Sequence, residues 1–443
     1  MFDPSMRYCS LALLVALTLP ACADDGDSTD PAPGGTGDVE TTGADEPDPT
    51  GADEDSSGGE DSDGSSSGEP SGPDFGGLEA QLDELRNDAG APGMAVALVQ
   101  GDQVVWSGGF GTRDMASGEP VTTETPFRLG SISKTFVGVA MMRAQELGVI
   151  DLGDAIDVPF TVDNPHLDGE SITYRDLAHH MSGIVDTLWY ECAYTSEDGT
   201  AYAAPQDQAF CPEAPMPGLD QFLGAYLDPE GSMYTDANYA SGADGEPGTT
   251  YEYSNVGAGL ASAALSHATE GALGQDFITF SNAEVFGPLG LEHTRWMRDE
   301  LPEPDAAAVP HVYEDGYVPV PRYNLSTFAD GALYSSVDDL AHYLAAIVPA
   351  RGGDVLESES ADALIDFVDV DDGDVVNGQG IFWERYLGLI GHTGADPGVA
   401  TAMGYDPEAE LGYVILLNST GPGTDTLMLQ VMGTLQAFAA ESL

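Results

Sequence analysis

The chain has 443 residues, 42% of them hydrophobic, which is enough to bury the core of one large domain or two smaller ones. Its 76 acidic and 12 basic residues give a formal net charge of −64, so the chain would repel both the phosphates of a nucleic acid and an anionic membrane surface. This charge argues against nucleic acid as a partner.

The first 22 residues resemble a bacterial lipoprotein signal. Arg7 precedes an apolar run, Leu11 to Leu19, that is shorter than the about 20 residues of a membrane-spanning helix. Leu19-Pro20-Ala21-Cys22 follows, and this pattern predicts Cys22 as the lipidated first residue of an exported, membrane-anchored chain. Ala23 is not the aspartate that retains similar lipoproteins in the inner membrane, which favours the outer membrane. An ordinary cleaved signal is the alternative, and it too would export the protein to the periplasm.

Residues 23–76 hold 17 acidic residues and no lysine or arginine, among mostly Gly, Ser, Thr, Pro and Ala. Such a segment buries too little apolar surface to fold, so we expect a disordered, self-repelling tether. Gly64-Ser65-Ser66-Ser67-Gly68 matches the G-x-S-x-G pattern of α/β-hydrolases, but no strand pattern precedes it and no helical pattern follows it. We interpret that match as chance.

The folded domain is predicted to span 77–443. Leu78 to Ala89 has the apolar spacing of an amphipathic helix, and Phe136 to Leu147 reads as a strongly apolar one. Between them, Gly101-Asp102 separates two apolar runs, Met94 to Val99 and Gln103 to Gly109, which predicts a β-hairpin.

The rest of the domain divides into an irregular part, a helical part and a final group of strands. Residues 184–250 lack sustained periodicity and indicate a long insertion beside a site. Helical patterns cover 256–270, 274–286, 336–348 and a closing 424–439, and strand patterns cover Gly380 to Ile390, Val399 to Gly404 and Leu411 to Asn418. We expect an α/β (α+β) fold in which both chain ends share one antiparallel sheet flanked by helices, with a mostly helical domain inserted between them. The catalytic cleft is expected at their junction.

Two of the four cysteines fall in the folded part. Cys9 and Cys22 belong to the signal, which leaves Cys192 and Cys211. Export favours a disulfide between these two, which would stabilise the chain by about 3 kcal/mol. Two buried free thiols are the alternative.

Ser131 and Lys134 form the first chemical motif, Ser131-Ile132-Ser133-Lys134, between an extended segment and the apolar helix. Positions i and i+3 share a helix face, and a buried lysine of lowered pKa can take the proton of a serine nucleophile. The helix start also offers free N–H groups to an oxyanion. Lys134 is the only lysine in the chain, so its position behind the serine argues against a surface pair of no consequence.

Tyr253 and Asn255 form the second motif, Tyr253-Ser254-Asn255, directly before a helical pattern. Two residues apart in an extended turn, both side chains can point into one cleft. Tyr253 would act as a proton shuttle, eased by a nearby lysine and histidine, and Asn255 would hold a substrate carbonyl or orient Lys134. Taken alone, such a turn is more often structural.

The third motif, His392-Thr393-Gly394, follows the strand run Tyr386 to Ile390. Gly394 lets a substrate backbone approach, and a strand edge can pair with an extended acyl chain. His392 would supply polarity or charge, Thr393 a hydroxyl to the substrate, and the Ala395 N–H a second oxyanion donor. Taken alone, the tripeptide reads as a loop histidine at a strand end.

The three motifs together, in this order, resemble the signatures of the serine β-lactamase and penicillin-binding-protein superfamily, and most closely its class C branch. That branch contains class C β-lactamases, D-alanyl-D-alanine carboxypeptidases of similar fold, and esterases. The resemblance covers roughly residues 78–440 and is supported by further stretches: Phe127-Arg128-Leu129-Gly130-Ser131, Leu177-Ala178-His179-His180-Met181-Ser182-Gly183, Pro247-Gly248-Thr249, Pro288-Leu289-Gly290-Leu291 and Gly331-Ala332-Leu333. It implies a β-lactamase-like fold with Ser131, Lys134 and Tyr253 as catalytic residues.

The resemblance also has limits. His392 stands where class C β-lactamases have lysine and carboxypeptidases and other hydrolases of the group often have histidine, which puts lactamase activity in doubt. We assign no glutamate to deacylation, so Tyr253 and Lys134 would serve that step. His179 and His180 are interpreted as structural, because no third metal ligand with suitable spacing accompanies them. The mechanism needs neither a metal nor an organic cofactor.

Three functions remain open. We expect an exported serine hydrolase that forms an acyl-enzyme on a peptide amide, of the D-alanyl-D-alanine carboxypeptidase type. The carboxylate of such a substrate would need a local cation, His392 or Arg385, to overcome the acidic surface. An esterase or weak β-lactamase of the same fold is the first alternative. A catalytically silent surface-binding lipoprotein is the second, disfavoured because all three motifs are intact.

Overall fold

The computed structural model describes residues 73–443 except 170, 197–209, 212–215, 217 and 374. The signal with Cys22, and all but the last residues of the predicted tether, lie outside the described residues. The tether prediction extends slightly too far, because helix α1 begins at Phe75. All described residues belong to a single unit.

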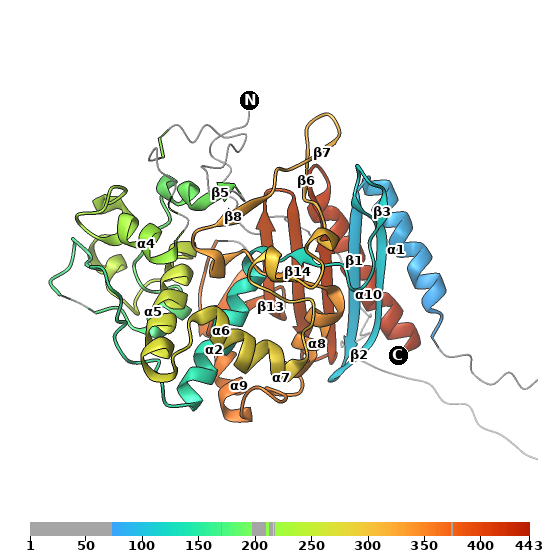
Figure 1. Ribbon diagram of the computed structural model, residues 1–443. Coiled ribbons are helices and arrows are strands. Elements are labelled where there is room, and N and C mark those ends of the chain that lie inside the picture. The colour runs from blue at the N-terminus through green and yellow to red at the C-terminus, as the bar shows by residue number, and fades with distance from the viewer. Residues whose placement is uncertain (1–72, 170, 197–209, 212–215, 217, 374) are drawn as a thin grey trace, which may run out of the picture. The chain divides into compact units, whose positions relative to one another are not determined.

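A nine-stranded sheet unites strands from both ends of the described chain (Figure 1). Each strand is antiparallel to its neighbours. The hairpin predicted at Gly101-Asp102 is confirmed, and its first strand pairs with the last long strand so that Met94 lies opposite Leu417. In order across the sheet, the strands are β10 (Val368–Asp369), β11 (Val376–Gln379), β12 (Glu384–Tyr386), β13 (Leu389–Asp396), β14 (Val399–Asp406), β15 (Leu411–Leu417), β1 (Gly93–Gln100), β2 (Gln103–Asp114) and β3 (Glu119–Pro120).

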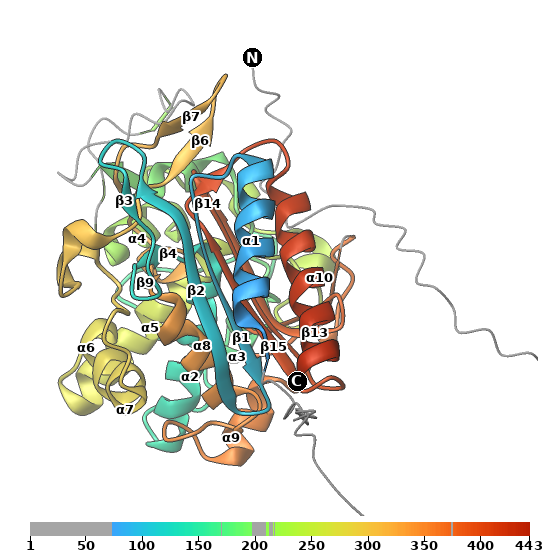
Figure 2. The same ribbon diagram turned by 90° about the vertical axis from the view of Figure 1, so that its right-hand side faces the viewer.

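Alternating side chains of β1 divide the hydrophobic core between the two faces of the sheet. Val96 and Leu98 pack on one face with α1 (Phe75–Ala89) and α10 (Thr424–Ser442), which lie side by side over it (Figure 2). Ala95, Ala97 and Val99 face the other core. This period of two is what a strand buried on both faces requires.

Helix α8 (Val337–Ile347) packs on the second face, against β1, β2, β14 and β15. The long helices α2 (Ser133–Glu146) and α5 (Asn255–Leu273) contact each other, and α5 lies among the helices beyond the sheet (Figure 1). The helix predicted for 274–286 is instead a short α-helix followed by a π-helical turn. The shorter helical elements are η1 (Gly130–Ile132), α3 (Tyr174–Ala178), η2 (Leu188–Ala193), α4 (Leu219–Leu227), η3 (Asp236–Asn238), η4 (Gly242–Gly245), α6 (Phe277–Ser281), η5 (Asn282–Phe286), α7 (Gly287–Leu289), η6 (Arg298–Glu300), η7 (Pro304–Ala306), η8 (Phe328–Asp330) and α9 (Ser358–Leu364). No helix in the described part of the chain is long and apolar enough to cross a bilayer.

The stretch Gly380 to Ile390, predicted as one strand, folds back on itself. Leu387 and Gly388 adopt positive φ of 49° and 81° and form the turn between β12 and β13, a conformation that glycine tolerates without strain. The continuous apolar run concealed this hairpin. Its register places Glu384 opposite Gly391, one residue before His392.

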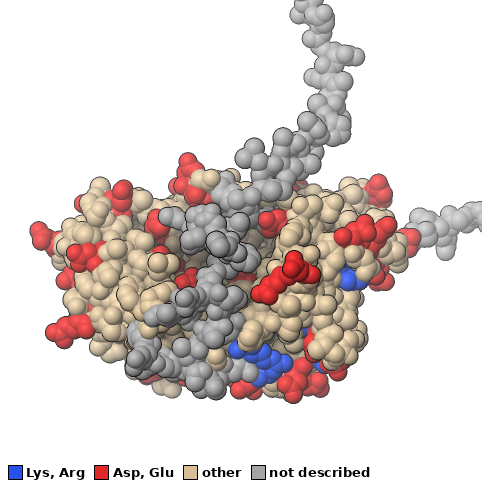
Figure 3. Space-filling model, turned by 90° about the horizontal axis from the view of Figure 1, so that it is seen from above, with Lys and Arg blue, Asp and Glu red and all other residues tan. Residues whose placement is uncertain are grey.

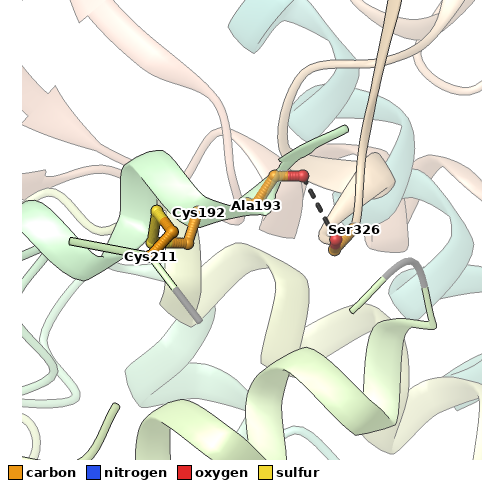
Figure 4. The surroundings of a disulfide bond; sticks show 4 residues. All are labelled: Cys192, Ala193, Cys211 and Ser326. Carbon is orange, nitrogen blue, oxygen red and sulfur yellow. Dashed lines mark hydrogen bonds between the residues drawn. A yellow bond between two sulfur atoms is a disulfide. The ribbon is translucent and has the colours of Figure 1, made fainter. Parts of the chain in front are cut away.

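Three small sheets and one disulfide connect the irregular segments. Cys192 and Cys211 are bonded, as predicted, with 5.6 Å between their Cα atoms (Figure 4). Next to the disulfide, the Ser326 hydroxyl donates to the Ala193 carbonyl at 3.1 Å. The small sheets pair β4 (Phe127–Arg128) with β9 (Tyr334–Ser335), β5 (Tyr194–Ser196) with β8 (Tyr323–Leu325), and β6 (His311–Tyr313) with both β7 (Tyr317–Pro319) and β16 (Ser419–Thr420).

Candidate active site

Ser131 lies in η1, the single 3₁₀ turn that leads into α2. This turn packs on β13 through two glycines. A Cβ added at Gly130 would lie 3.0 Å from the Ala395 nitrogen, and one at Gly394 would lie 3.1 Å from the Ser131 nitrogen, both closer than side chains normally pack. The close approach brings the backbone nitrogens of Ser131 and Ala395, the two predicted oxyanion donors, to the same part of the site.

Lys134 points from the first turn of α2 at the serine. Its Nζ is 3.0 Å from Ser131 Oγ, 2.7 Å from Asn255 Oδ1 and 2.6 Å from the Asp330 carbonyl oxygen. The amide oxygen and the carbonyl accept two of its hydrogens. The third tetrahedral position of Nζ therefore faces Ser131 Oγ, where a neutral amine would present its lone pair.

Burial lowers the pKa of Lys134 toward the range that a general base needs. Its side chain is fully buried, and desolvation lowers its pKa from 10.5 to about 8, against the opposing effects of Asp330, Asp186 and Glu384. Neutral amine is thus accessible near pH 8, as a general base requires.

Tyr253 is held between Lys134 and two histidines. Lys134 Nζ lies 5.0 Å from the centre of its ring, and the ring centres of His180 and His392 lie 4.4 Å and 6.3 Å away. Burial raises the pKa of Tyr253 well above its ordinary value, and its hydrogen bond with Ser131 acts in the opposite direction. The expectation that its neighbours ease its deprotonation is therefore wrong for the resting site, where the phenol keeps its proton.

Asp186 fixes the turn that carries the second motif. Its carboxylate accepts hydrogen bonds from the Ser254 hydroxyl at 2.7 Å, the Asn255 nitrogen at 2.7 Å and the Val256 nitrogen at 3.1 Å. Ser254 caps α5 by accepting from the Gly257 nitrogen, so the acid secures the free N–H groups of the helix start. The sequence reasoning missed Asp186, because it lies 69 residues before Asn255 and only the fold brings them together.

His180 has a larger part in the site than its position at the end of α3 predicted. Its Nδ1 accepts from the Ser254 nitrogen at 3.1 Å, and its ring is tilted against Tyr253 at the centroid distance given above. Burial lowers its pKa well below the ordinary value, so it is a neutral ring that supports the tyrosine. Its structural role is consistent with the prediction, but its place beside Tyr253 came from the structure.

His392 lies within β13 rather than after a strand, and it is neutral. Only 2% of the residue is exposed, and burial, followed by the charge of Lys134, lowers its pKa to about 3. Its Nδ1 lies 2.6 Å from the Thr393 carbonyl oxygen, which can only accept. Nδ1 therefore carries the proton, and Nε2 keeps its lone pair.

The carboxyl group of Glu384 lies next to His392. Its Oε1 lies 3.4 Å from His392 Nε2, and burial raises its pKa from 4.5 to about 8 although the charge of Lys134 opposes this. An unprotonated Nε2 opposite a carboxyl group of raised pKa indicates a neutral pair in which the proton resides on Glu384. The β12–β13 hairpin, which the sequence did not reveal, makes this contact.

Arg385 does not contribute charge to the cleft. Successive residues of a strand point to opposite faces, so Arg385 is turned away from the side on which Glu384 meets His392. Its guanidinium donates to Asp369 at 2.8 Å and to Asn377 at 2.7 Å on the surface. The prediction of Arg385 or His392 as a local cation is therefore wrong for both.

Asp330 holds Lys134 in position through its backbone carbonyl oxygen. Besides accepting from Nζ through its carbonyl, it accepts from the Tyr190 hydroxyl at 2.8 Å through its carboxyl group. Burial raises the pKa of this carboxyl to about 7. Tyr190 lies in η2 two residues before Cys192, so the disulfide-bonded segment adjoins the support of the base. Asp330 precedes Gly331-Ala332-Leu333, one of the stretches noted in the sequence, but nothing in the pattern marked it.

Thr393 and Ala395 complete the site on the β13 side. Both are reachable by solvent, as is Ser131, and a chain laid along β13 would meet them in turn. The arrangement combines a hydroxyl beside a base, a protonated phenol and two neighbouring backbone N–H groups. These are the groups that acyl transfer requires. Among the residues that the structure describes, no group of three His, Cys, Asp or Glu side chains is placed to hold a metal ion.

Comparison with known proteins gives a consistent picture. Residues 78–432 match the family model described as Beta-lactamase. A penicillin-binding protein of Bacillus subtilis is 23% identical over 328 residues, 70% of this chain and 64% of that protein, so the chain spans less than two thirds of this curated relative.

Two solved structures share the fold. The D-amino acid amidase of Ochrobactrum anthropi SV3, complexed with D-phenylalanine, is similar with a TM-score of 0.60 and 20% identity, covering 83% of this chain and 100% of that chain. EstCE1, a hydrolase with promiscuous acyltransferase activity, has a TM-score of 0.61 and 18% identity, covering 82% and 98%.

Proposed function

The chain belongs to the beta-lactamase family, and on this premise we propose that it is a serine hydrolase acting through an acyl-enzyme on Ser131. The observation that carries the proposal is the 3.0 Å contact between Ser131 Oγ and a fully buried Lys134 Nζ. Such a contact gives the serine a base without any cofactor.

Acylation follows from the contacts around Lys134. Neutral Nζ takes the proton as Ser131 Oγ attacks the acyl carbonyl, and the resulting ammonium donates to Ser131 Oγ, Asn255 and the Asp330 carbonyl. The carbonyl oxygen gains negative charge and is stabilised by the N–H groups of Ser131 and Ala395. As the tetrahedral intermediate collapses, Tyr253 gives its proton to the departing group and recovers one from Lys134.

Deacylation uses the same groups in the opposite direction. A water attacks the acyl carbon while its proton passes to the Tyr253 oxygen and the phenol proton of Tyr253 passes to neutral Lys134, and Ser131 then leaves with that proton from Lys134. The raised pKa of Tyr253 suits its part in acylation, because a phenol that holds its proton at rest can donate it when a basic leaving group forms.

The charges around Ser131 favour an uncharged substrate. In the active form of the site Lys134 is neutral, and His392 and the protonated Glu384 carry no charge, so the carboxylates of Asp330 and Asp186 are the charged groups that remain. The sequence has no lysine or arginine between Arg175 and Arg295, so the long insertion adds no cation. A substrate ending in a carboxylate would meet net negative potential here.

An uncharged amide or ester is therefore the proposed substrate, in preference to the free D-alanyl-D-alanine terminus. The two solved relatives fit this reading, since one is named an amidase and the other a hydrolase with acyltransferase activity. A carboxypeptidase would need a cation near Ser131 to bind the terminal carboxylate of its substrate. It is the second candidate function only on that condition. Arg128, nearest in sequence to the serine, is paired with Asp396 and 1% exposed.

The experiment compares matched substrates. D-alanyl-D-alaninamide and D-alanyl-D-alanine dipeptides carrying the same N-acyl group differ only in terminal charge, and a nitrophenyl butyrate ester provides a third measure. We expect kcat/KM to be higher for the amide-terminated peptide and the ester than for the carboxylate. A preference for the carboxylate would refute the substrate proposal.

The serine mechanism is tested separately. Ser131→Ala is expected to lower kcat at least about 10³-fold and to abolish labelling by a fluorescent fluorophosphonate, which phosphonylates an active serine with loss of fluoride. Ser133→Ala is the matched control, because Ser133 is a neighbouring serine whose hydroxyl donates to the Gly130 carbonyl and accepts from the Leu333 nitrogen. Retained turnover in Ser131→Ala would refute the mechanism whatever the substrate.

We further propose that the enzyme is exported and lipid-anchored through Cys22, with residues 23–76 as its tether. The expected observation is detergent-phase partition of the full chain and its loss in Cys22→Ser. Equal partition of both proteins would contradict lipidation.

A further inference from the structure

The two oxyanion donors come from segments that are far apart in the chain. Ser131 lies in η1, whereas Ala395 lies in β13. Both backbone N–H groups must stay within hydrogen-bond reach of the same substrate oxygen to stabilise the charge that forms on it. A group that fixes the spacing between η1 and β13 would therefore act on the reaction without touching the substrate.

Thr401, on the neighbouring strand β14, contacts both segments. It lies opposite Gly394 in the strand register and is 1% exposed. Its hydroxyl donates to the Leu129 carbonyl at 2.6 Å, and its Oγ1 lies 3.3 Å from the Gly394 carbonyl oxygen. Gly394 leaves this path open, because a Cβ there would clash with both Thr401 Oγ1 and the Leu129 carbonyl oxygen. The hydroxyl thus links β14 directly to the residue that precedes η1.

The same hydroxyl lies behind the peptide group that supplies one oxyanion donor. The Gly394 carbonyl and the Ala395 N–H belong to one peptide unit, which is planar and trans, so they point in opposite directions. The carbonyl points toward Thr401 on β14, and the N–H therefore points toward the other edge of β13. On that edge, β12 pairs with Leu389 to Gly391 and ends before Ala395, which is exposed. A substrate carbonyl can therefore approach this N–H.

A buried ion pair holds the same two segments together independently of Thr401. Charged side chains at the surface, such as the acidic ones on the face shown in Figure 3, are screened by water. Arg128 and Asp396 are instead 1% and 3% exposed, and Arg128 Nε donates to Asp396 at 3.0 Å. Arg128 precedes η1, and Asp396 directly follows Ala395. We therefore expect the segments to stay in contact when the Thr401 hydroxyl is removed, with only their spacing and orientation altered.

We propose that Thr401 is a positioning residue for the oxyanion donors of Ser131 and Ala395. This role rests on the proposed acyl transfer at Ser131. The hydroxyl fixes the spacing between η1 and β13 and the orientation of the Ala395 peptide, and it does so through two backbone carbonyl groups. Its effect falls on the transition state, in which the substrate oxygen gains negative charge.

Two substitutions separate the hydroxyl from the shape of the side chain. Thr401→Val keeps the branched shape but places a methyl carbon where Oγ1 contacts the Leu129 carbonyl oxygen. Such a carbon packs about 3.3–3.6 Å from a carbonyl oxygen, so η1 must move away from β14. We expect kcat/KM for nitrophenyl butyrate to fall at least about tenfold, since a displacement of about 1 Å in an active site can cost about 10²-fold. Thr401→Ser keeps the donor and should recover most of the wild-type value.

Replacing the substrate oxygen by sulfur reports on the donors directly. In nitrophenyl thionobutyrate, sulfur takes the place of the carbonyl oxygen, and it is larger and accepts hydrogen bonds more weakly. Well-placed N–H donors therefore favour the oxoester over the thionoester. The ratio of the two kcat/KM values should fall several-fold in Thr401→Val and stay near the wild-type value in Thr401→Ser. A loss of stability alone would not change this ratio.

Thr269→Val is the matched control. Thr269 is also buried, and its hydroxyl also donates to a backbone carbonyl, that of Leu265 at 3.0 Å. It lies about 21 Å along α5 from Asn255, so its replacement should change neither kcat/KM nor the ratio. Thr401→Ala provides a second variant that lacks the donor but adds no methyl group near the carbonyl oxygens, and it should also lower the ratio. Circular dichroism checks that each variant is folded.

The outcomes separate this role from the proposed function. Wild-type activity and an unchanged ratio in folded Thr401→Val or Thr401→Ala would refute the positioning role, while Ser131-dependent turnover by the wild type would leave the proposed function standing. Equal losses of activity in Thr401→Val and Thr269→Val at a constant ratio would also refute the role. If the wild type showed no Ser131-dependent turnover of either ester, the proposed function would be refuted together with it.

Discussion

Glu384→Gln gives the sharpest test of the electrostatics of the site. In the folded enzyme the carboxyl group faces the unprotonated Nε2 of His392 at 3.4 Å and has its pKa raised by burial to about 8. In the unfolded chain it titrates near its ordinary value of 4.5. Glutamine keeps the shape of the side chain, but it has no proton to lose.

The sign of the pH effect follows from proton binding. Between pH 4.5 and about 8 the folded state holds a proton on Glu384 that the unfolded state has released, so stability falls as pH rises through this window. The contribution is fully present below pH 4.5. The two pKa values, at about 1.4 kcal/mol for each unit between them, correspond to roughly 5 kcal/mol.

The assay is urea denaturation of wild type and variant at pH 5, 6, 7 and 8. Groups such as Asp330 and His392 are common to both proteins and cancel to first order in the difference. We expect the free energy of unfolding of wild type, relative to Glu384→Gln, to fall by several kcal/mol between pH 5 and pH 8. Glu408→Gln, an exposed glutamate on the β14–β15 turn, should show no such trend. A difference independent of pH would refute the assignment of the proton to Glu384.

Three further predictions concern the base, the helix start and the disulfide. Because Lys134 must be neutral to act, kcat/KM for an uncharged ester should rise tenfold per pH unit below about 8 and level off above it; a flat profile from pH 5 to 9 would contradict this role. Asp186→Ala should lower the free energy of unfolding by about 3 kcal/mol, measured in urea, because it leaves buried N–H groups unpaired, and it should reduce kcat by displacing Asn255. Asp186→Asn should retain part of the stability and part of kcat. An unchanged kcat in Asp186→Ala would show that Asp186 has only a structural role. Replacing Cys192 and Cys211 by serine should cost about 3 kcal/mol of stability for a loop of sequence separation 19, seen as a lower Tm, whereas an unchanged Tm would show that the loop ordering contributes nothing.

Local patterns were sufficient for the parts of the fold whose residues are close in sequence. The hairpin from Met94 to Gly109, the helix behind Ser131 and the closing helix all follow from apolar spacing and turn residues within one segment. Ser131 and Lys134 could be paired from sequence because three residues of helix separate them, and their distance is a property of the helix. The Cys192 and Cys211 pair was predicted from the cysteine count together with the expectation of export.

Long-range contacts decided the rest. The sequence by itself predicted the groups that we propose for the chemistry: a serine, a single lysine, a tyrosine and a glycine-bearing strand. Only the tertiary structure decided their protonation, because burial depends on every element that packs around a side chain. Glu384 is 8 residues before His392 along the chain, yet it meets the imidazole only because Leu387 and Gly388 turn the strand back. Burial, together with the charge of Lys134, makes His392 neutral rather than cationic, and this is the reason that we propose an uncharged acyl compound as the substrate.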